Sequence, residues 1–142
     1  MFRKSYLIAL VIIGLLIPTM AAATDEFDGK WYFEAELLRG FMPPQGRGDG
    51  AAAREFRESF LNNTWLLLDT AQRRMEMAVF GEPTETDYFI IVEQAPGMLR
   101  IKPLTGHETT VLRLDEAGEL QIIEQTGFMM RLRRNPPEQS AF

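Results

Sequence analysis

Turn signals recur about every ten to twelve residues between Trp65 and Arg134, and this spacing restricts the fold more than any other feature of the chain. The segments between the turns alternate apolar and polar side chains, which is the period of a half-buried strand. Connections this short can join only antiparallel neighbours. The sequence therefore predicts a continuous meander of antiparallel strands, whose turns contain Gln72, Gly81, Gly97, Gly106, Gly118 and Gly127.

One further strand precedes this region. The segment from Trp31 to Leu37 alternates, with Trp31, Phe33, Ala35 and Leu37 on one face. Eight antiparallel strands most simply close into a barrel, which removes exposed sheet edges. We therefore expect an all-β fold with one helix: an eight-stranded antiparallel up-and-down β-barrel. Its seven later strands are expected at 65–69, 73–80, 86–93, 98–104, 108–114, 119–124 and 128–133.

The helix is expected between the first and second strands. Residues 39–50 are dense in glycine and proline, which predicts a loop. The segment AAAREFRESFLN follows it, and Asp49 is suited to accept hydrogen bonds from the amides of the first turn. Ala52, Phe56 and Phe60 form the apolar stripe of this helix, and charged residues cover the opposite side. The stripe either packs against the edge of the core or lies over an opening in the barrel.

Residues 1–23 form the pattern of a secretory signal peptide. Arg3 and Lys4 precede an uninterrupted apolar run at 6–17, and Ala23 ends a stretch of small residues. A membrane-spanning helix needs about 20 apolar residues, so the run is too short to favour a membrane anchor. We expect cleavage after Ala23, a domain of residues 24–142, and a periplasmic or secreted location. The absence of cysteine fits a bacterial periplasm better than a disulfide-rich secreted scaffold.

The charge balance argues against two classes of partner. The formal net charge of the whole sequence is −5, and residues 1–23 hold two basic and no acidic side chains, so the domain that follows carries −7. Nucleic acid requires a basic surface, and so does an anionic membrane surface. The outward faces of the predicted strands also carry charged residues such as Arg74 and Lys102, unlike those of a membrane-embedded barrel. We expect neither nucleic-acid binding nor stable membrane insertion after signal cleavage.

Gly29, Lys30 and Trp31 open the first strand, and an arginine-rich strand ends the domain. This arrangement resembles the calycin plan, in which lipocalins and fatty-acid-binding proteins begin the barrel with Gly-x-Trp. In lipocalins an arginine from the last strand packs over that tryptophan at the closed end. The resemblance implies a lipocalin-like domain in which Trp31 forms the floor and Arg131 or Arg133 is its cation–π partner. The helix inserted after the first strand is similar to the lid of the fatty-acid-binding branch.

No set of residues in the sequence would activate a nucleophile. The chain contains no cysteine, and its one histidine, His107, falls in a predicted turn as a solvated side chain. The alternative, an uncharacterised hydrolase, would need a carboxylate as its general base. We therefore expect no enzymatic activity and no cofactor, since the glycines at 46, 48 and 50 form a flexible loop rather than a phosphate cradle. Asp25, Glu26 and Asp28 lie in a flexible polar leader, so no metal site is expected.

Two functions stay open at this stage. In the first, the barrel binds a small apolar molecule inside, where methionines suit varied apolar ligands. The residues expected to line that site are Phe33, Phe56, Phe60, Met75, Met77, Tyr88, Ile90 and Met130. In the second, the barrel is a solid scaffold, and the 39–50 loop with Phe41 and Met42 contacts an envelope protein as an interaction module or inhibitor. A filled interior would exclude the first function, and exposed apolar side chains in the loop would favour the second.

Overall fold

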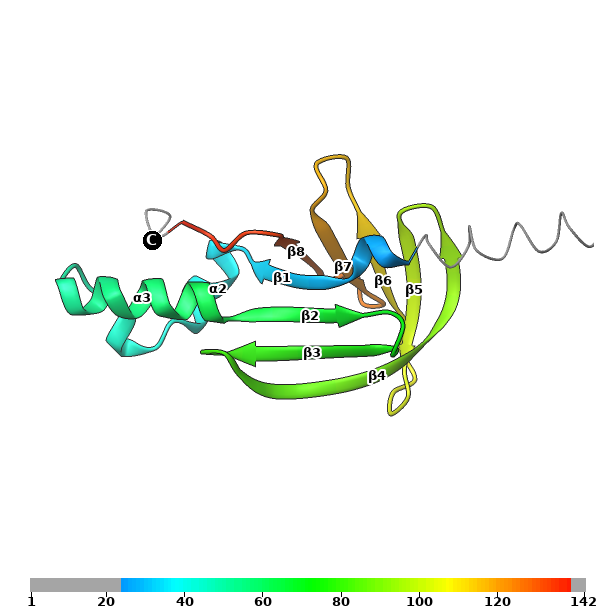
Figure 1. The fold of residues 1–142 in the computed structure, drawn as a ribbon, viewed down its shortest axis with the longest axis horizontal. Helices are drawn as coiled ribbons and strands as arrows, with labels where there is room; N and C mark the ends of the chain where they lie inside the picture. Colours follow the sequence, from blue (N-terminus) through cyan, green and yellow to red (C-terminus); the bar gives the residue numbers. More distant parts are fainter. Residues whose placement is uncertain (1–23, 139–142) are drawn as a thin grey trace, which may run out of the picture.

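The computed structural model describes residues 24–138 and forms a closed antiparallel barrel of eight strands in sequence order (Figure 1). The strands are β1 (Gly29–Phe33), β2 (Trp65–Asp69), β3 (Arg74–Val79), β4 (Glu82–Ala95), β5 (Met98–Pro103), β6 (Thr110–Leu114), β7 (Leu120–Glu124) and β8 (Met129–Arg133). Within the described residues, two α-helices and a 3-10 helix separate β1 from β2: α2 (Ala35–Phe41), η2 (Pro44–Gly46) and α3 (Ala51–Asn63). The predicted barrel and the position of its helical insertion are confirmed, although the insertion holds two α-helices instead of one. The predicted signal peptide lies outside the described residues.

One contiguous cluster of apolar side chains occupies the inside of the barrel. Seven of the eight strands contribute buried members to it, and β3 packs half-buried side chains against it, because inward positions alternate with outward positions along each strand. Its fully buried members include Trp31, Leu68, Leu99, Leu112 and Leu120. Half-buried side chains pack against this cluster from several strands: Met75, Met77, Val79, Ile91, Leu114 and Met130. An eight-stranded barrel is just wide enough for its own side chains to fill, and this one follows that rule.

The first strand ends earlier than its alternation predicts. β1 stops at Phe33, and the residues from Ala35 onward begin α2 instead. Leu38 and Met42 lie one helical turn apart, and both are buried, at 5% and 3% exposed. Burial of this pair favours the helix, so the predicted strand over 31–37 is wrong beyond Phe33.

The predicted second helical segment forms as α3, with small differences at its start. Gly50, and not Asp49, occupies the N-cap position, and no side chain caps the first turn. Phe60 is buried and Phe56 half-buried, whereas Ala52 is exposed. The apolar stripe therefore packs only over its later part, nearer to β2.

The turn after β3 is shorter than the interval between the strands predicted at 73–80 and 86–93. Phe80 and Gly81 alone form it, with φ angles of 54° and 78°. Positive φ at both positions is the geometry of a two-residue type I′ hairpin. The rings of Phe56 and Phe60 each lie 5.1 Å from the ring of Phe80, and the Gly81 N–H donates to the Asn63 carbonyl at 2.7 Å. These contacts with α3 hold a phenylalanine in a conformation that usually requires glycine.

The segment before β1 closes one end of the barrel. Thr24 to Asp28 is not a flexible leader, because its 3-10 helix η1 (Asp25–Phe27) buries Phe27 completely, at 0% exposed. The indole Nε1 of Trp31 donates to the Phe27 carbonyl at 2.8 Å. The Thr70 N–H, in the turn after β2, donates to Asp28 Oδ1 at 2.7 Å. The segment is therefore attached to β1 and to the turn between β2 and β3.

An arginine packs over the Trp31 indole, as the calycin resemblance implies, but the residue is Arg134. Its guanidinium carbon lies 3.6 Å from the ring centroid. Its Nη1 donates to the Asp28 carbonyl at 2.7 Å, and its Nη2 donates to the Glu26 carbonyl at 2.9 Å. Burial lowers the pKa of Arg134 below its usual value, and the Asp28 carboxylate partly opposes that shift.

The prediction that Arg131 or Arg133 is the cation–π partner of Trp31 is wrong. Both occupy exposed outward positions of β8, on either side of a buried leucine. Arg133 instead forms ion pairs with Glu119 at 3.0 Å and with Glu34 at 3.8 Å. Arg134 follows the last residue of β8, so its side chain can fold back over β1.

The glycine of the Gly-x-Trp motif makes room for this contact. Gly29 has a φ of 109°, a conformation that other residues rarely adopt. A Cβ atom at this position would lie only 2.9 Å from Nη1 of Arg134. Both defining residues of the motif therefore help to close the barrel: Trp31 stacks with Arg134, and Gly29 leaves room for it.

Arg134→Ala is expected to lower the free energy of unfolding by about 1–3 kcal/mol. The change removes a cation–π contact and two charge-assisted hydrogen bonds from a partly exposed site. Urea unfolding followed by tryptophan fluorescence measures the loss. Arg133→Ala is the matched control and should cost less than about 1 kcal/mol, because it removes only exposed ion pairs. Equal losses in the two variants would show that Arg134 has no special part in closing the barrel.

Candidate functional site

Most of the residues predicted to line an interior ligand site belong to the core or pack against it. These are Phe33, Phe56, Phe60, Met75, Met77 and Met130. Tyr88 and Ile90 do not join them, since they lie outside at 51% and 48% exposed. The prediction that these two side chains face the interior is therefore wrong.

The inward residues of β4 are the alternate set, Phe89 and Ile91. The stretch 88–92 is apolar on both faces, so its two-residue period cannot show which face turns inward. The register settles the choice, because Tyr88 lies opposite Arg74, whose charged head needs solvent. The row that contains both residues faces outward, and Phe89 is 2% exposed.

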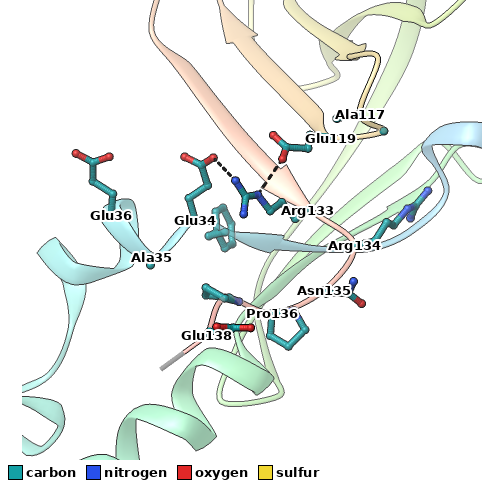
Figure 2. Close-up of a pocket in the computed structure, with 13 residues that line it drawn as sticks. Glu34, Ala35, Glu36, Ala117, Glu119, Arg133, Arg134, Asn135, Pro136 and Glu138 are labelled. Atoms are coloured by element: carbon teal, nitrogen blue, oxygen red, sulfur yellow. Dashed lines mark ion pairs between the residues drawn. The ribbon is translucent and has the colours of Figure 1, made fainter. Parts of the chain in front are cut away.

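A hollow of about 810 Å³ lies outside the barrel, between the start of α2 and the segment after β8 (Figure 2). Figure 2 shows the Arg133 guanidinium between the carboxylates of Glu34 and Glu119, with Pro136 and Glu138 on the opposite side. Two arginines line this hollow: Arg133 pairs with two acids, and Arg134 donates to backbone carbonyls and stacks on Trp31. Both are therefore poorly placed to recognise an anionic ligand.

A smaller hollow of about 290 Å³ adjoins the first and shares two of its glutamates. It lies between α2 and the start of β8. Leu37 and Met130 are half-buried in its lining, whereas Phe128 and Met129 are 51% and 41% exposed. Phe128, which the alternation predicts to face inward, thus lies at the surface.

The predicted 39–50 loop is held in place by contacts with α3 and by packing of its own side chains. Arg57 Nη1 donates to the carbonyls of Gly46 and Gly48. Met42 is buried, at 3% exposed. It packs closely on Gly46, because a Cβ atom added to Gly46 would lie 2.5 Å from the Met42 sulfur. Phe41, at the end of α2, is 72% exposed. Only one of the two apolar residues predicted to contact a partner is therefore available.

Four exposed apolar side chains lie along β4 and immediately after β5. We call this the outer apolar surface, and it consists of Tyr88, Ile90, Val92 and Leu104. Their exposed fractions are 51%, 48%, 53% and 65%. The Leu104 N–H donates to the Tyr88 carbonyl at 2.9 Å, which places the two residues side by side. Sequence analysis missed this surface, although the apolar run on both faces of 88–92 was a signal for it.

Basic side chains border the outer apolar surface. Arg74 and Lys102 lie opposite two of its members in the strand register. Arg100 forms an ion pair with Glu93 at 3.1 Å, and Arg74 approaches an aspartate only at 4.0 Å. Lys102 forms no ion pair with any residue in the described range 24–138. A chain of net charge −5 thus presents an apolar surface with a basic border.

No group of three or more histidine, cysteine, aspartate or glutamate side chains in residues 24–138 is arranged to hold a metal ion. His107 is exposed in the connection between β5 and β6. The expected absence of enzymatic activity, cofactor and metal stays a prediction. Over the same part of the chain, no helix has the length and apolar character needed to cross a membrane.

No family model matches this chain, and no curated protein or solved structure matches it significantly. Its closed eight-stranded antiparallel barrel is compatible with the calycin plan. Inference about its function therefore rests on the residues described above.

Ile90→Thr is expected to change the free energy of unfolding by no more than about 0.5 kcal/mol, because the side chain lies outside the core. Phe89→Ala, at the neighbouring position, should cost about 3–5 kcal/mol, since it leaves a cavity among buried side chains. Chemical denaturation of both variants measures the contrast. A large loss for Ile90→Thr with a small loss for Phe89→Ala would mean that β4 turns its other face to the core.

Proposed function

We propose that this chain is an exported, calycin-like scaffold that binds another protein through its outer apolar surface. The observation that carries the proposal is the exposure of three apolar side chains along β4 and of a fourth that follows β5: Tyr88, Ile90, Val92 and Leu104. The predicted signal peptide supports export to the periplasm, where the partner would be an envelope protein.

The interior supports a scaffold more than a carrier. Apolar side chains from seven of the eight strands meet in one cluster, against which β3 packs half-buried side chains, and Leu38, Met42, Phe60 and Leu61 of the helical insertion join it. Both hollows described above open on the outside of the barrel. A solid core of this kind stabilises a rigid surface, and a rigid surface loses little conformational entropy when a partner binds.

The outer apolar surface has the chemistry of a protein contact. Exposed apolar patches of a few hundred Å² often mark interaction sites in monomeric proteins. Tyrosine is also enriched among the residues that contribute most to binding energy at interfaces, and Tyr88 lies in this surface. The 39–50 segment is a weaker choice, because Met42 is buried and Phe41 stands alone.

A photoreactive residue at position 88 should crosslink the full chain to a discrete partner in the cells that produce it. The expected result is one adduct of higher mass, reduced at least tenfold when Ile90→Lys places a charge in the outer apolar surface. The same photoreactive residue at Gln125, in the turn between β7 and β8, is the matched control and should give no adduct. Denaturing gels and mass spectrometry of the adduct provide the measurement.

Two outcomes would contradict this assignment. If no adduct forms from position 88, the outer apolar surface does not bind a protein. If Phe41→Ser removes the adduct while Ile90→Lys leaves it intact, the contact depends on the end of α2 instead. The second outcome would retain a protein partner and restore the loop-based contact that the sequence predicts.

A second candidate function is the binding of a small apolar molecule inside the barrel. Its support is the partial exposure of Met75, Met77 and Met130, which pack against the core without being fully covered by it. Titration with the uncharged fluorophore N-phenyl-1-naphthylamine separates the two candidates. A scaffold with a filled core should give no saturable increase in fluorescence. Saturable binding that Met77→Arg abolishes and Ile90→Lys preserves would favour the interior site.

A further inference from the structure

β4 extends well beyond each of the two strands that pair with it (Figure 1). It has 14 residues, from Glu82 to Ala95. β3 pairs with it from Glu82 to Tyr88, and β5 pairs with it from Phe89 to Ala95. Each half of β4 therefore has a strand on one side only. Its other edge has no strand partner in the part of the chain that the structure describes.

The backbone of β4 points alternately to the β3 side and to the β5 side. The Phe89 N–H donates to the Arg73 carbonyl on the β3 side at 2.9 Å, whereas the Tyr88 carbonyl accepts from Leu104 on the β5 side. Continued alternation directs the N–H and carbonyl of Ile91 to the β3 side. The β3 ladder has already ended there, so Ile91 offers a donor and an acceptor at a free edge.

The two free edges of β4 differ in chemistry. The first half carries residues that protect a sheet edge from added strands: Glu82, Pro83, Glu85 and Asp87. The second half reads FIIV over 89–92, which is apolar and has no proline, and its pairing with β5 shifts at a bulge between Ile91 and Glu93. Apolar side chains and a free edge are what strand addition requires. The apolar run that precedes the bulge makes 89–93 the more receptive half of β4.

We propose that a partner protein adds an extended strand to the free edge of β4 at 89–93. This inference rests on the proposed protein-binding function and specifies how the partner is held. Main-chain hydrogen bonds to Ile91 align the added strand. Its alternate side chains lie against Ile90 and Val92, which extends the outer apolar surface across the new strand.

Charge selects the occupant of this edge. Arg73 and Arg74 lie on the β3 side next to it, and Lys102 lies across β4 opposite Ile90, so a strand with acidic residues beside its apolar ones is complementary. A second copy of this chain would bring these basic residues against one another. An anionic lipid surface shares the charge preference but supplies no strand to pair with Ile91.

The probe for this proposal is a synthetic peptide of valine–threonine repeats with two glutamates at each end. It is titrated into the folded chain, and backbone amide chemical shifts report the site. The shifts are expected to concentrate at 89–93 and in the turn between β2 and β3. The same peptide with lysines in place of the glutamates should bind at least tenfold more weakly. A version N-methylated at its valines cannot form the ladder and should not bind.

Ile91→Pro removes the edge N–H while the β5 ladder remains, and it should weaken peptide binding at least tenfold. Thr86→Pro is the matched control, because the same alternation directs the Thr86 amide to the protected free edge, and it should leave binding unchanged. Ile91 also packs against the core, so Ile91→Ala reports the effect of the lost side chain alone. Circular dichroism and urea unfolding verify that each variant is folded.

Several outcomes would overturn strand addition. One is an equal loss of peptide binding in Ile91→Pro and Ile91→Ala, and another is equal binding of the lysine-ended peptide. Phosphatidylglycerol vesicles that bind the chain when the peptide does not would assign the surface to lipid. If the crosslink from position 88 persists in Ile91→Pro, protein binding stands and strand addition fails. If that crosslink never forms, both proposals fail.

Discussion

The guanidinium of Arg134 joins the two ends of the sheet, and the closed barrel depends on this contact. The ladder between β1 and β8 contains only two residue pairs, whereas β1 and β2 pair over four. Arg134 adds to that short ladder by stacking on Trp31 and by donating to the carbonyls of the segment before β1. Trp31 in turn donates to Phe27, which is fully buried in the closed end. The cation, the indole and the 3-10 helix therefore stabilise one another, and each loses a partner if another is removed.

The closed end and the apolar core leave the outside of the molecule as the place for a binding site. Phe27 fills the end where the chain enters the barrel, and side chains of the helical insertion join the core from elsewhere in the fold. The insertion is anchored by Leu38 and Met42, and its longer helix supports the hairpin between β3 and β4 through Phe80. These contacts bury apolar side chains that would face the cavity if the insertion were a lid over an open barrel. The most accessible apolar chemistry is consequently on the outer face of β4 and β5.

The same geometry that closes the barrel leaves the edges of β4 uncovered. Closure requires strands to tilt and their pairing to be staggered, so a long strand extends beyond both of its neighbours. The acids and Pro83 in the first half of β4 limit unwanted pairing there. The second half is apolar from Phe89 to Val92, where a bulge interrupts its pairing with β5. This difference within one strand links the architecture of the barrel to the proposed mode of partner binding.

Alternation and turn spacing alone determined the number of strands, their antiparallel order and the place of the helical insertion. These features are local, because a short connection leaves a strand no other neighbour to pair with. The Gly-x-Trp motif likewise pointed to a tryptophan floor with an arginine over it. Its glycine is required by the φ of 109° and by the close approach of the arginine.

Tertiary structure alone decided which arginine that is, which face of 88–92 turns inward, and that 35–41 is helical. Each of these choices depends on contacts between residues distant in sequence, such as Arg134 over Trp31 and Tyr88 opposite Arg74. A run that is apolar on both faces satisfies the strand period in either orientation. The orientation follows only when the register places a charge beside one of its rows, and that register is a property of the closed sheet.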